Sequence, residues 1–404
     1  MPVKISDNRS FCKYCRKKIS LDIPNQACQG CLAEIDLHRK DNPLIELEMI
    51  LNERIPIITD GENNRFGFSV NKDGEITNLR ISDRKINYLP DINYLKHLKI
   101  LSLGDNSLSN ISERYSFPPT LKKLDLSNNR FSSFPINLSF PTCLEGLNLE
   151  NNEIVVFPIK ILNLKKLKYL NLNNNKLKFL PDGICELLNL EQIFLDNNDL
   201  QTLPDNIGNL KNLYEIKIDN NPIKTLPDTF WKHHDYDIFE IHNTNLTTLP
   251  ETICEIKDLS VLDLTNNNLN TLPENIHKLN TVGVFYLGDN NISRLPDNFA
   301  LLTSYSELYL NNNPLTNLPL NVEIMKKLEF LDLTGIPALG KQSKCYEHDE
   351  IYPFLLMRFY FDEFLPHKEN FPQEKSSFQF QFFKDDQYFS LIESVDELSL
   401  NNFL

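Results

Sequence analysis

The hydrophobic and polar positions of the chain follow a template that recurs every 22 or 23 residues. A full copy reads LxxLxLxxNxLxxLPxxIxxLxx, as in the segment that begins at Leu167. A fixed period of this length is typical of repeat proteins, so we expect stacked units and not one globular core. The first template position is filled in twelve successive segments by Ile76, Leu98, Leu121, Leu144, Leu167, Leu190, Leu213, Tyr236, Leu259, Val282, Tyr305 and Leu328.

Each template position predicts a local structure. In the fifth segment Leu170 and Leu172 alternate with polar neighbours, which is the pattern of a half-buried strand. Asn175 follows where the chain leaves that strand, and its amide can bond backbone groups of the turn. Pro181 fixes φ and predicts an extended or short helical return path. We therefore expect a parallel sheet whose third, fifth and seventh positions point to solvent.

The template resembles the 23-residue, LPxxI-bearing class of leucine-rich-repeat proteins, which includes Ras-associated scaffold proteins and many prokaryotic proteins. The resemblance covers about residues 76–340 and implies an α/β solenoid with a curved parallel sheet. It is specific for the fold and much less so for function, because adaptors, receptors, inhibitors and ligase substrate-binding arms share this fold. No ligand-contact residues can be transferred from the family.

The segments outside the repeats predict three further domains. Residues 1–40 form a four-cysteine module, and residues 41–75 contain a helical pattern and a hairpin pattern that would cap the first repeat. After the repeats (76–340), residues 341–404 are rich in Phe and Tyr. Dense aromatic side chains favour aggregation when exposed, so we expect this last segment to cap the final repeat, with partner binding as the alternative.

The N-terminal cysteines predict a metal site. Cys12, Cys15, Cys28 and Cys31 form two CxxC pairs separated by twelve residues. Four thiolates match the tetrahedral preference of Zn²⁺, and a module of this size needs such a staple to fold. A rubredoxin-type iron site and a pair of disulfides are the alternatives. The second ligand set that a RING domain needs is missing from the sequence.

Charge separates this module from the rest of the chain. Residues 1–40 hold eight Lys or Arg against four Asp or Glu, a balance of +4. Because the net charge of the whole chain is −14, the remaining residues carry a net charge of −18. The acidic repeats would repel nucleic acid. The basic residues near the two CxxC pairs are weak support for a contact with nucleic acid or an acidic protein. The simpler interpretation is a purely structural zinc module.

The solvent-facing strand positions predict a binding face. Thirty-six such positions carry nine acids and three bases, with several aromatic side chains among them. Aromatic residues anchor many protein interfaces, so we expect a concave face for a protein partner with basic residues. The alternative is a solvated surface without a partner. The residues chosen for this face are Tyr169, Phe194, Asp196, Glu215, Asp219, Glu240, Asp263, Tyr286, Glu307 and Tyr309.

The sequence contains no complete catalytic motif, so we do not expect an enzyme. The stretch from Gly335 to Gln342 nearly matches a phosphate loop but fails at Gln342. Cys345 and His348 could be a nucleophile and its base, as in bacterial repeat-bearing ubiquitin ligases. Those ligases carry a large separate catalytic domain, whereas only about 60 residues follow here. The segment TFWKHHDYD, with Trp231 and His233, leaves a weaker case for a metal or ligand pocket.

The location and class of the protein follow from these patterns. No apolar run long enough to span a membrane and no apolar leader is present, so we expect a cytoplasmic protein without membrane insertion. The leading hypothesis is a non-catalytic scaffold or adaptor, with a role in signalling. The alternative is a zinc-dependent regulatory or effector protein, in which the repeats select a target for a terminal module.

Overall fold

The computed structural model describes most of the repeat region and parts of the two ends. The described residues are 2–5, 9–12, 44, 48, 51, 53–58, 65–89, 92–231, 237–319 and 327–351, and for 2–5 and 9–12 only the backbone is described. Three of the predicted zinc ligands (Cys15, Cys28 and Cys31) lie outside these residues, as do His233 and the aromatic segment after residue 351.

The chain divides into two compact units, each described here by itself. The N-terminal unit contains Met1–Leu177 and Asn189–Phe194, and the C-terminal unit contains Lys178–Leu188 and Leu195–Leu404. The N-terminal unit includes a separate antiparallel pair, β1 (Pro2–Ile5) and β2 (Arg9–Cys12), in which Pro2 lies opposite Cys12.

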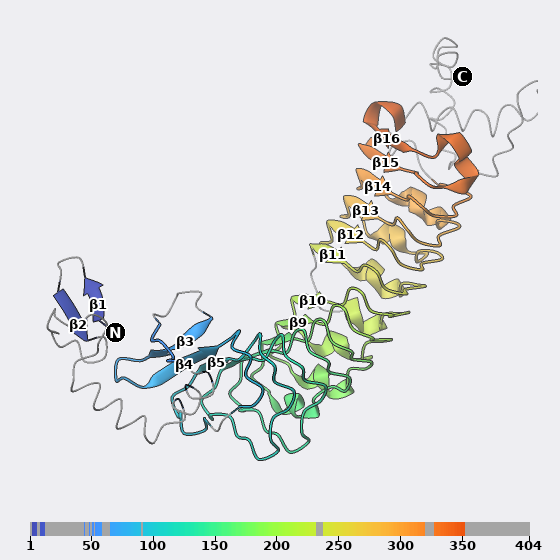
Figure 1. The fold of residues 1–404 in the computed structure, drawn as a ribbon. Helices are drawn as coiled ribbons and strands as arrows, with labels where there is room; N and C mark the ends of the chain where they lie inside the picture. Colours follow the sequence, from blue (N-terminus) through green and yellow to red (C-terminus); the bar gives the residue numbers. More distant parts are fainter. Residues whose placement is uncertain are drawn as a thin grey trace, which may run out of the picture. The chain divides into compact units, whose positions relative to one another are not determined.

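The main sheet of the N-terminal unit begins with a hairpin. Strands β3 (Phe66–Val70) and β4 (Ile76–Ile81) are antiparallel, and Asn71 organises their turn by accepting the N–H groups of Asp73 and Glu75 at 2.9 and 3.0 Å. Parallel strands follow in chain order (Figure 1). Each is offset from the last by one repeat, so that Gly146 pairs with Tyr169. They are β5 (Ile100–Ser102), β6 (Lys123–Asp125), β7 (Gly146–Asn148), β8 (Tyr169–Asn171) and β9 (Gln192–Phe194).

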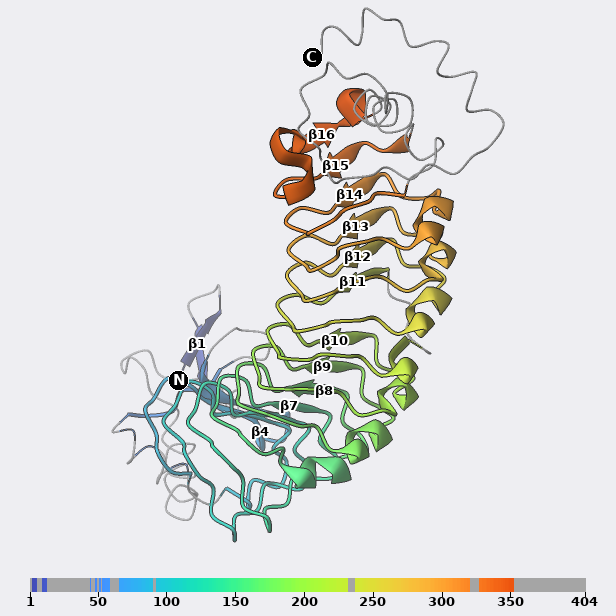
Figure 2. The same cartoon turned by 90° about the vertical axis from the view of Figure 1, so that its right-hand side faces the viewer.

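The C-terminal unit contains β10 (Glu215–Lys217) and then a six-stranded sheet, to which β10 does not belong. In that sheet the strands stack side by side in chain order (Figure 2), and the last one is antiparallel, with Tyr346 opposite Leu331. The sheet consists of β11 (Ile238–Glu240), β12 (Val261–Asp263), β13 (Val284–Tyr286), β14 (Glu307–Tyr309), β15 (Phe330–Asp332) and β16 (Cys345–Glu347).

Short 3₁₀ helices form the return path of many repeats, as the proline positions predict. Pro181, with φ −72°, immediately precedes η2 (Asp182–Glu186). In the N-terminal unit the corresponding helix is η1 (Ile159–Asn163). The other helices of the C-terminal unit are η3 (Ile207–Asn209), η4 (Asp228–Trp231), η5 (Glu251–Glu255), η6 (Ile276–Lys278), η7 (Asp297–Leu301) and η8 (Pro337–Gln342).

The template leucines form the core, and a buried asparagine closes each typical repeat. Leu264, Leu269 and Leu287 are fully buried. Asn290 donates from Nδ2 to the carbonyls of Leu264, Leu287 and Gly288 at 2.9–3.1 Å and accepts the N–H of Leu269 at 3.0 Å. These bonds satisfy backbone groups that would otherwise be buried without partners, which explains the asparagine of the template.

The residue before that asparagine takes a left-handed backbone conformation. For example, φ is 52° at Asn128 and 55° at Asp289. Asn and Asp tolerate this region better than other residues with a Cβ atom, because their short polar side chains can bond locally. The frequent Asn-Asn pairs of the sequence therefore have two separate causes, a left-handed turn at the first residue and a buried bonding role at the second.

Within the part of the chain that is described, no helix has the length and apolar character needed to cross a membrane.

Candidate functional site

The strand face, defined as the side chains at the third, fifth and seventh positions of each repeat, contains all the residues chosen for binding. Tyr169 and Phe194 lie in the N-terminal unit, and the other eight lie in the C-terminal unit. The rings of Tyr169 and Phe194 have centroids 5.6 Å apart at 50°. The strand face of the C-terminal unit holds the larger group, and the candidate site is built there.

A histidine links two of the predicted acids next to the end of the six-stranded sheet. His242 follows β11, and its Nε2 lies 3.0 Å from Oδ2 of Asp263 while its Nδ1 lies 3.3 Å from Oδ2 of Asp219. The backbone N–H of His242 donates to Oδ1 of Asp219 at 2.8 Å. The hydrogen bonds to Asp219 and then Asp263 raise the pKa of His242 to about 10, so the ring is a cation at neutral pH.

The same arrangement affects the neighbouring carboxylates. Oδ1 of Asp196 accepts the N–H of Asp219 at 2.8 Å, and burial raises the pKa of Asp196 to about 6. Burial alone would also raise the pKa of Asp263, but hydrogen bonds from His242 and Thr265 leave it lowered.

Lys217 and Glu240 form a further pair on the strand face. Nζ of Lys217 lies 3.1 Å from Oε2 of Glu240. Asp219, Glu240 and Asp263 are therefore each engaged by a cationic side chain of the same protein. Their charge is partly neutralised before any partner arrives, so the acidic count alone overstates how much negative charge this part of the face presents.

The aromatic residues of the strand face form a continuous strip, called here the aromatic strip and defined as Tyr286, Tyr309 and Phe330. The rings of Tyr286 and Tyr309 are stacked at 4.4 Å, and those of Tyr309 and Phe330 lie 4.9 Å apart. The three side chains come from the neighbouring strands β13, β14 and β15, and each is only half-buried. Tyr286 and Tyr309 belong to the residues predicted for the binding face, and Phe330 is a further solvent-facing aromatic residue beside them.

Acids border the aromatic strip. Oε2 of Glu307 accepts the hydroxyl of Tyr309 at 2.9 Å, and burial together with this bond raises the pKa of Tyr309. Asp332 is half-buried on β15, and Glu347 is exposed on β16, opposite Phe330. On the other side of the strip the strand face continues with the valine side chains of Val261 and Val284, which are half-buried. The result is an apolar surface with a carboxylate border.

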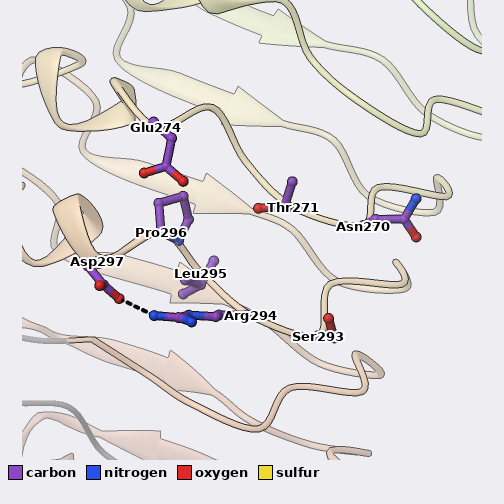
Figure 3. A pocket seen from close by; sticks show the side chains of 8 residues that line it. All are labelled: Asn270, Thr271, Glu274, Ser293, Arg294, Leu295, Pro296 and Asp297. Atoms are coloured by element: carbon purple, nitrogen blue, oxygen red, sulfur yellow. Dashed lines mark hydrogen bonds and ion pairs between the residues drawn. The ribbon is translucent and has the colours of Figure 1, made fainter.

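A separate hollow of the C-terminal unit is polar. It measures about 280 Å³ and is lined mainly by polar side chains, including Glu274, Ser293 and Arg294 (Figure 3). The guanidinium of Arg294 is already paired with Asp297 at 2.7 Å. Among the described residues no group of three His, Cys, Asp or Glu side chains is arranged to hold a metal ion, and this includes the surroundings of His242.

The sequence matches two family models. Both are described as leucine-rich repeat, one over residues 142–200 and the other over residues 120–140 and 258–279. No curated protein matches the chain.

Solved structures of repeat proteins are similar to the chain. A leucine-rich-repeat protein of Leptospira interrogans, LIC12759, is 28% identical over 64% of this chain and 77% of its own, with a TM-score of 0.44. The plant peptide hormone receptor RGFR1, solved in complex with RGF2, is 25% identical over 68% of this chain, with a TM-score of 0.54. The ectodomain of the receptor kinase GASSHO1/SCHENGEN3 of Arabidopsis thaliana is 24% identical over 67% of this chain, with a TM-score of 0.56.

The chain spans half of the length of the RGFR1 chain and 34% of the GASSHO1/SCHENGEN3 chain. The parallel sheets, the buried asparagines and the family matches agree on one architecture. The chain carries leucine-rich repeats in both units, and its parallel sheets have the architecture of a leucine-rich-repeat solenoid.

Proposed function

We propose that the protein is a non-catalytic binding scaffold that holds a protein partner on the strand face of its C-terminal unit. The observation that carries this proposal is the aromatic strip, since Tyr286, Tyr309 and Phe330 remain half-exposed although a repeat sheet needs no aromatic residues on its solvent side. Rigid aromatic side chains provide large contact areas at little cost in conformational entropy.

The acids at the border of the strip define the chemistry of the partner. Glu307, Asp332 and Glu347 lie on the three strands that carry or flank Tyr309 and Phe330. We infer a partner with apolar side chains for the strip and Lys or Arg for the border. RGFR1, a peptide hormone receptor solved in complex with RGF2, supports a protein or peptide ligand for a fold of this kind.

The experiment that tests the proposal uses the intact chain as bait. Proteins captured from the cells that produce it are identified, and the affinity of each purified candidate is measured for the wild type and for Tyr309→Ala. Removing a central aromatic anchor should weaken binding by roughly 2 kcal/mol, which is about 30-fold. The matched control is Tyr214→Ala, because Tyr214 is 62% exposed in the same unit but lies outside the strand face.

Charge reversal separates the border from the strip. Glu307→Lys with Asp332→Lys should slow association, and the effect should shrink at high salt, because border charges act mainly by steering. Reversal at Asp219, Glu240 or Asp263 would break their internal ion pairs with His242 and Lys217. Reversal at Glu307 breaks its bond to the Tyr309 hydroxyl and reversal at Asp332 breaks its bond to the N–H of Thr334, neither of which is an ion pair. Equal affinity of Tyr309→Ala and Tyr214→Ala for every captured protein would reject the strand face as the site.

We propose further that residues 1–40 bind one Zn²⁺ through Cys12, Cys15, Cys28 and Cys31. The support is the spacing of the two CxxC pairs, together with the hairpin of β1 and β2, whose second strand ends at the first of these cysteines. Metal analysis of the purified chain should give one zinc per molecule, falling to near zero in Cys28→Ser with Cys31→Ser. A regulatory or effector role of this module is the second candidate function, and loss of partner binding or activity on zinc removal would favour it.

A further inference from the structure

An apolar hollow in the N-terminal unit is not explained by the fold. It lies on the return side of repeats three and four, in the segments that follow Phe134 and Phe157, and measures about 270 Å³. Two isoleucines and a valine at its rim are largely in solvent, with exposed fractions of 70% for Ile136, 70% for Val156 and 57% for Ile159. We call this hollow, with its rim, the outer groove.

The repeat template shows that these exposed apolar residues are unusual. Ile136 and Ile159 occupy the position after the template proline, which is acidic in eight of the twelve repeats. An acid is favourable there because it lies beside unpaired N–H groups at the start of the return helix. The acidic residues at this position are Asp91, Glu113, Asp182, Asp205, Asp228, Glu251, Glu274 and Asp297.

A second template position changes in the same way. Val156 stands two residues before the proline, where repeats six to nine have Thr202, Thr225, Thr248 and Thr271. Folding of a repeat thus does not require an apolar residue at either position. Exposed apolar residues clustered in two adjacent repeats mark an interaction site.

The floor of the outer groove is aromatic and well packed. The ring of Phe134 lies 4.9 Å from Phe131 and 6.0 Å from Phe140, and Phe157 is buried. The groove is slightly smaller than the roughly 300–1,000 Å³ of small-molecule pockets, so it suits one or two inserted side chains. A hollow with firm aromatic walls fits a protruding side chain better than it fits the flat surface of a bilayer.

The charge at the groove is opposite to the net negative charge of residues 41–404. Lys160 is the charged residue that lines it, and no acid does. Within the described part of the chain, Lys160 has no ion-pair partner. In most other repeats the Asp or Glu at the position of Ile136 and Ile159 would repel a carboxylate, whereas here Lys160 attracts one.

We propose that the outer groove binds a peptide segment of a second protein, in which a large apolar side chain enters the hollow and an adjacent Asp or Glu pairs with Lys160. This site is separate from the aromatic strip and calls for the opposite partner charge. The proposal therefore goes beyond the function proposed above, and its failure would leave that function untouched.

The test starts from random dodecapeptides displayed on phage and selected against the full chain. The expected consensus pairs Leu, Ile or Phe with a neighbouring Asp or Glu. The best peptide is then synthesised, labelled and titrated against the wild type and against Ile136→Asn with Ile159→Asn, for which we expect at least tenfold weaker binding. Leu301→Asn is the control, since Leu301 is 54% exposed but lies outside the groove.

A second pair of variants isolates the charge. Lys160→Gln should weaken the peptide about fivefold, and a peptide with Gln in place of its acid should lose the same factor on the wild type but nothing more on Lys160→Gln. Val156→Thr, which introduces the residue that repeats six to nine have at this position, keeps the test valid if the double variant folds poorly.

Vesicles of phosphatidylcholine with one quarter phosphatidylserine are tested in parallel. Several results would overturn the proposal: no selected consensus, a consensus without the apolar and acidic pair, binding unaffected by the groove variants, or binding of the vesicles in place of the peptide with loss in the same variants.

Discussion

His242 illustrates how the repeat period decides which side chains meet. Residues one repeat apart occupy equivalent places in successive repeats, so Asp219 and His242 are neighbours although 23 residues separate them and although β10 and β11 belong to different sheets. The same step joins Lys217 to Glu240. A cation thus lies between carboxylates in an acidic face, and it relieves their mutual repulsion.

We expect His242 to make stability depend on pH. Its folded-state pKa of about 10 exceeds the ordinary 6.5, so the folded protein holds a proton that the unfolded chain releases between these values. The stabilisation is therefore complete below about pH 6.5 and is lost as the pH rises toward 10. In His242→Gln this loss should be absent, and the variant should be less stable at neutral pH by about 2 kcal/mol.

Urea denaturation at several pH values checks this expectation. Trp231 is the only tryptophan, and the centroid of its ring lies 4.5 Å from that of Phe239 on β11. Its fluorescence therefore reports on the repeats next to His242. Equal slopes of stability against pH in the wild type and the variant, from pH 6.5 to 10, would show that His242 is not held as described.

The sequence predicted which residues share the strand face but not how they pair. The number of acids on the strand face does not reveal that Asp219, Glu240 and Asp263 are paired, because it takes no account of which residues occupy equivalent positions in adjacent repeats. Comparing positions 23 apart would have found both pairs. Phe330 is a solvent-facing aromatic residue of the same face, and the sequence does not show that its ring lies 4.9 Å from that of Tyr309.

At the scale of the strands and turns, the buried asparagines hold each turn to the one before it. Asn290→Ala would remove three donated bonds and leave the N–H of Leu269 buried without its acceptor. Because an unsatisfied buried group costs its full desolvation penalty, we expect a loss of about 3 kcal/mol. Asn291→Ala, one residue later and exposed, should be nearly neutral. Chemical denaturation of both variants measures the difference, and similar stabilities would contradict this role.

The strands, the proline-initiated return helices and the asparagine turns could be predicted because each depends on a local template position. The interruption of the sheet between β10 and β11 could not be predicted from the leucine pattern, which continues through it. The signal present there was Thr244 at the asparagine position. Thr244 bonds Asn267 through its hydroxyl and cannot supply the amide donors of an asparagine.

At the scale of the whole molecule, the repeats provide two surfaces with different chemistry, each described within its own unit. The strand face of the C-terminal unit combines aromatic rings with carboxylates, and the outer groove of the N-terminal unit combines aliphatic residues with a lysine. The template explains the core of every repeat, so departures from it at solvent-exposed positions carry the information about binding.

The most direct test of the binding face is hydroxyl-radical footprinting of the chain with and without a captured partner, read by mass spectrometry. Bound partner should lower the oxidation of Tyr286, Tyr309 and Phe330 at least fivefold, while Tyr214, which is 62% exposed, keeps its oxidation rate. Unchanged oxidation of all three rings in a saturated complex would contradict the account and place the partner elsewhere.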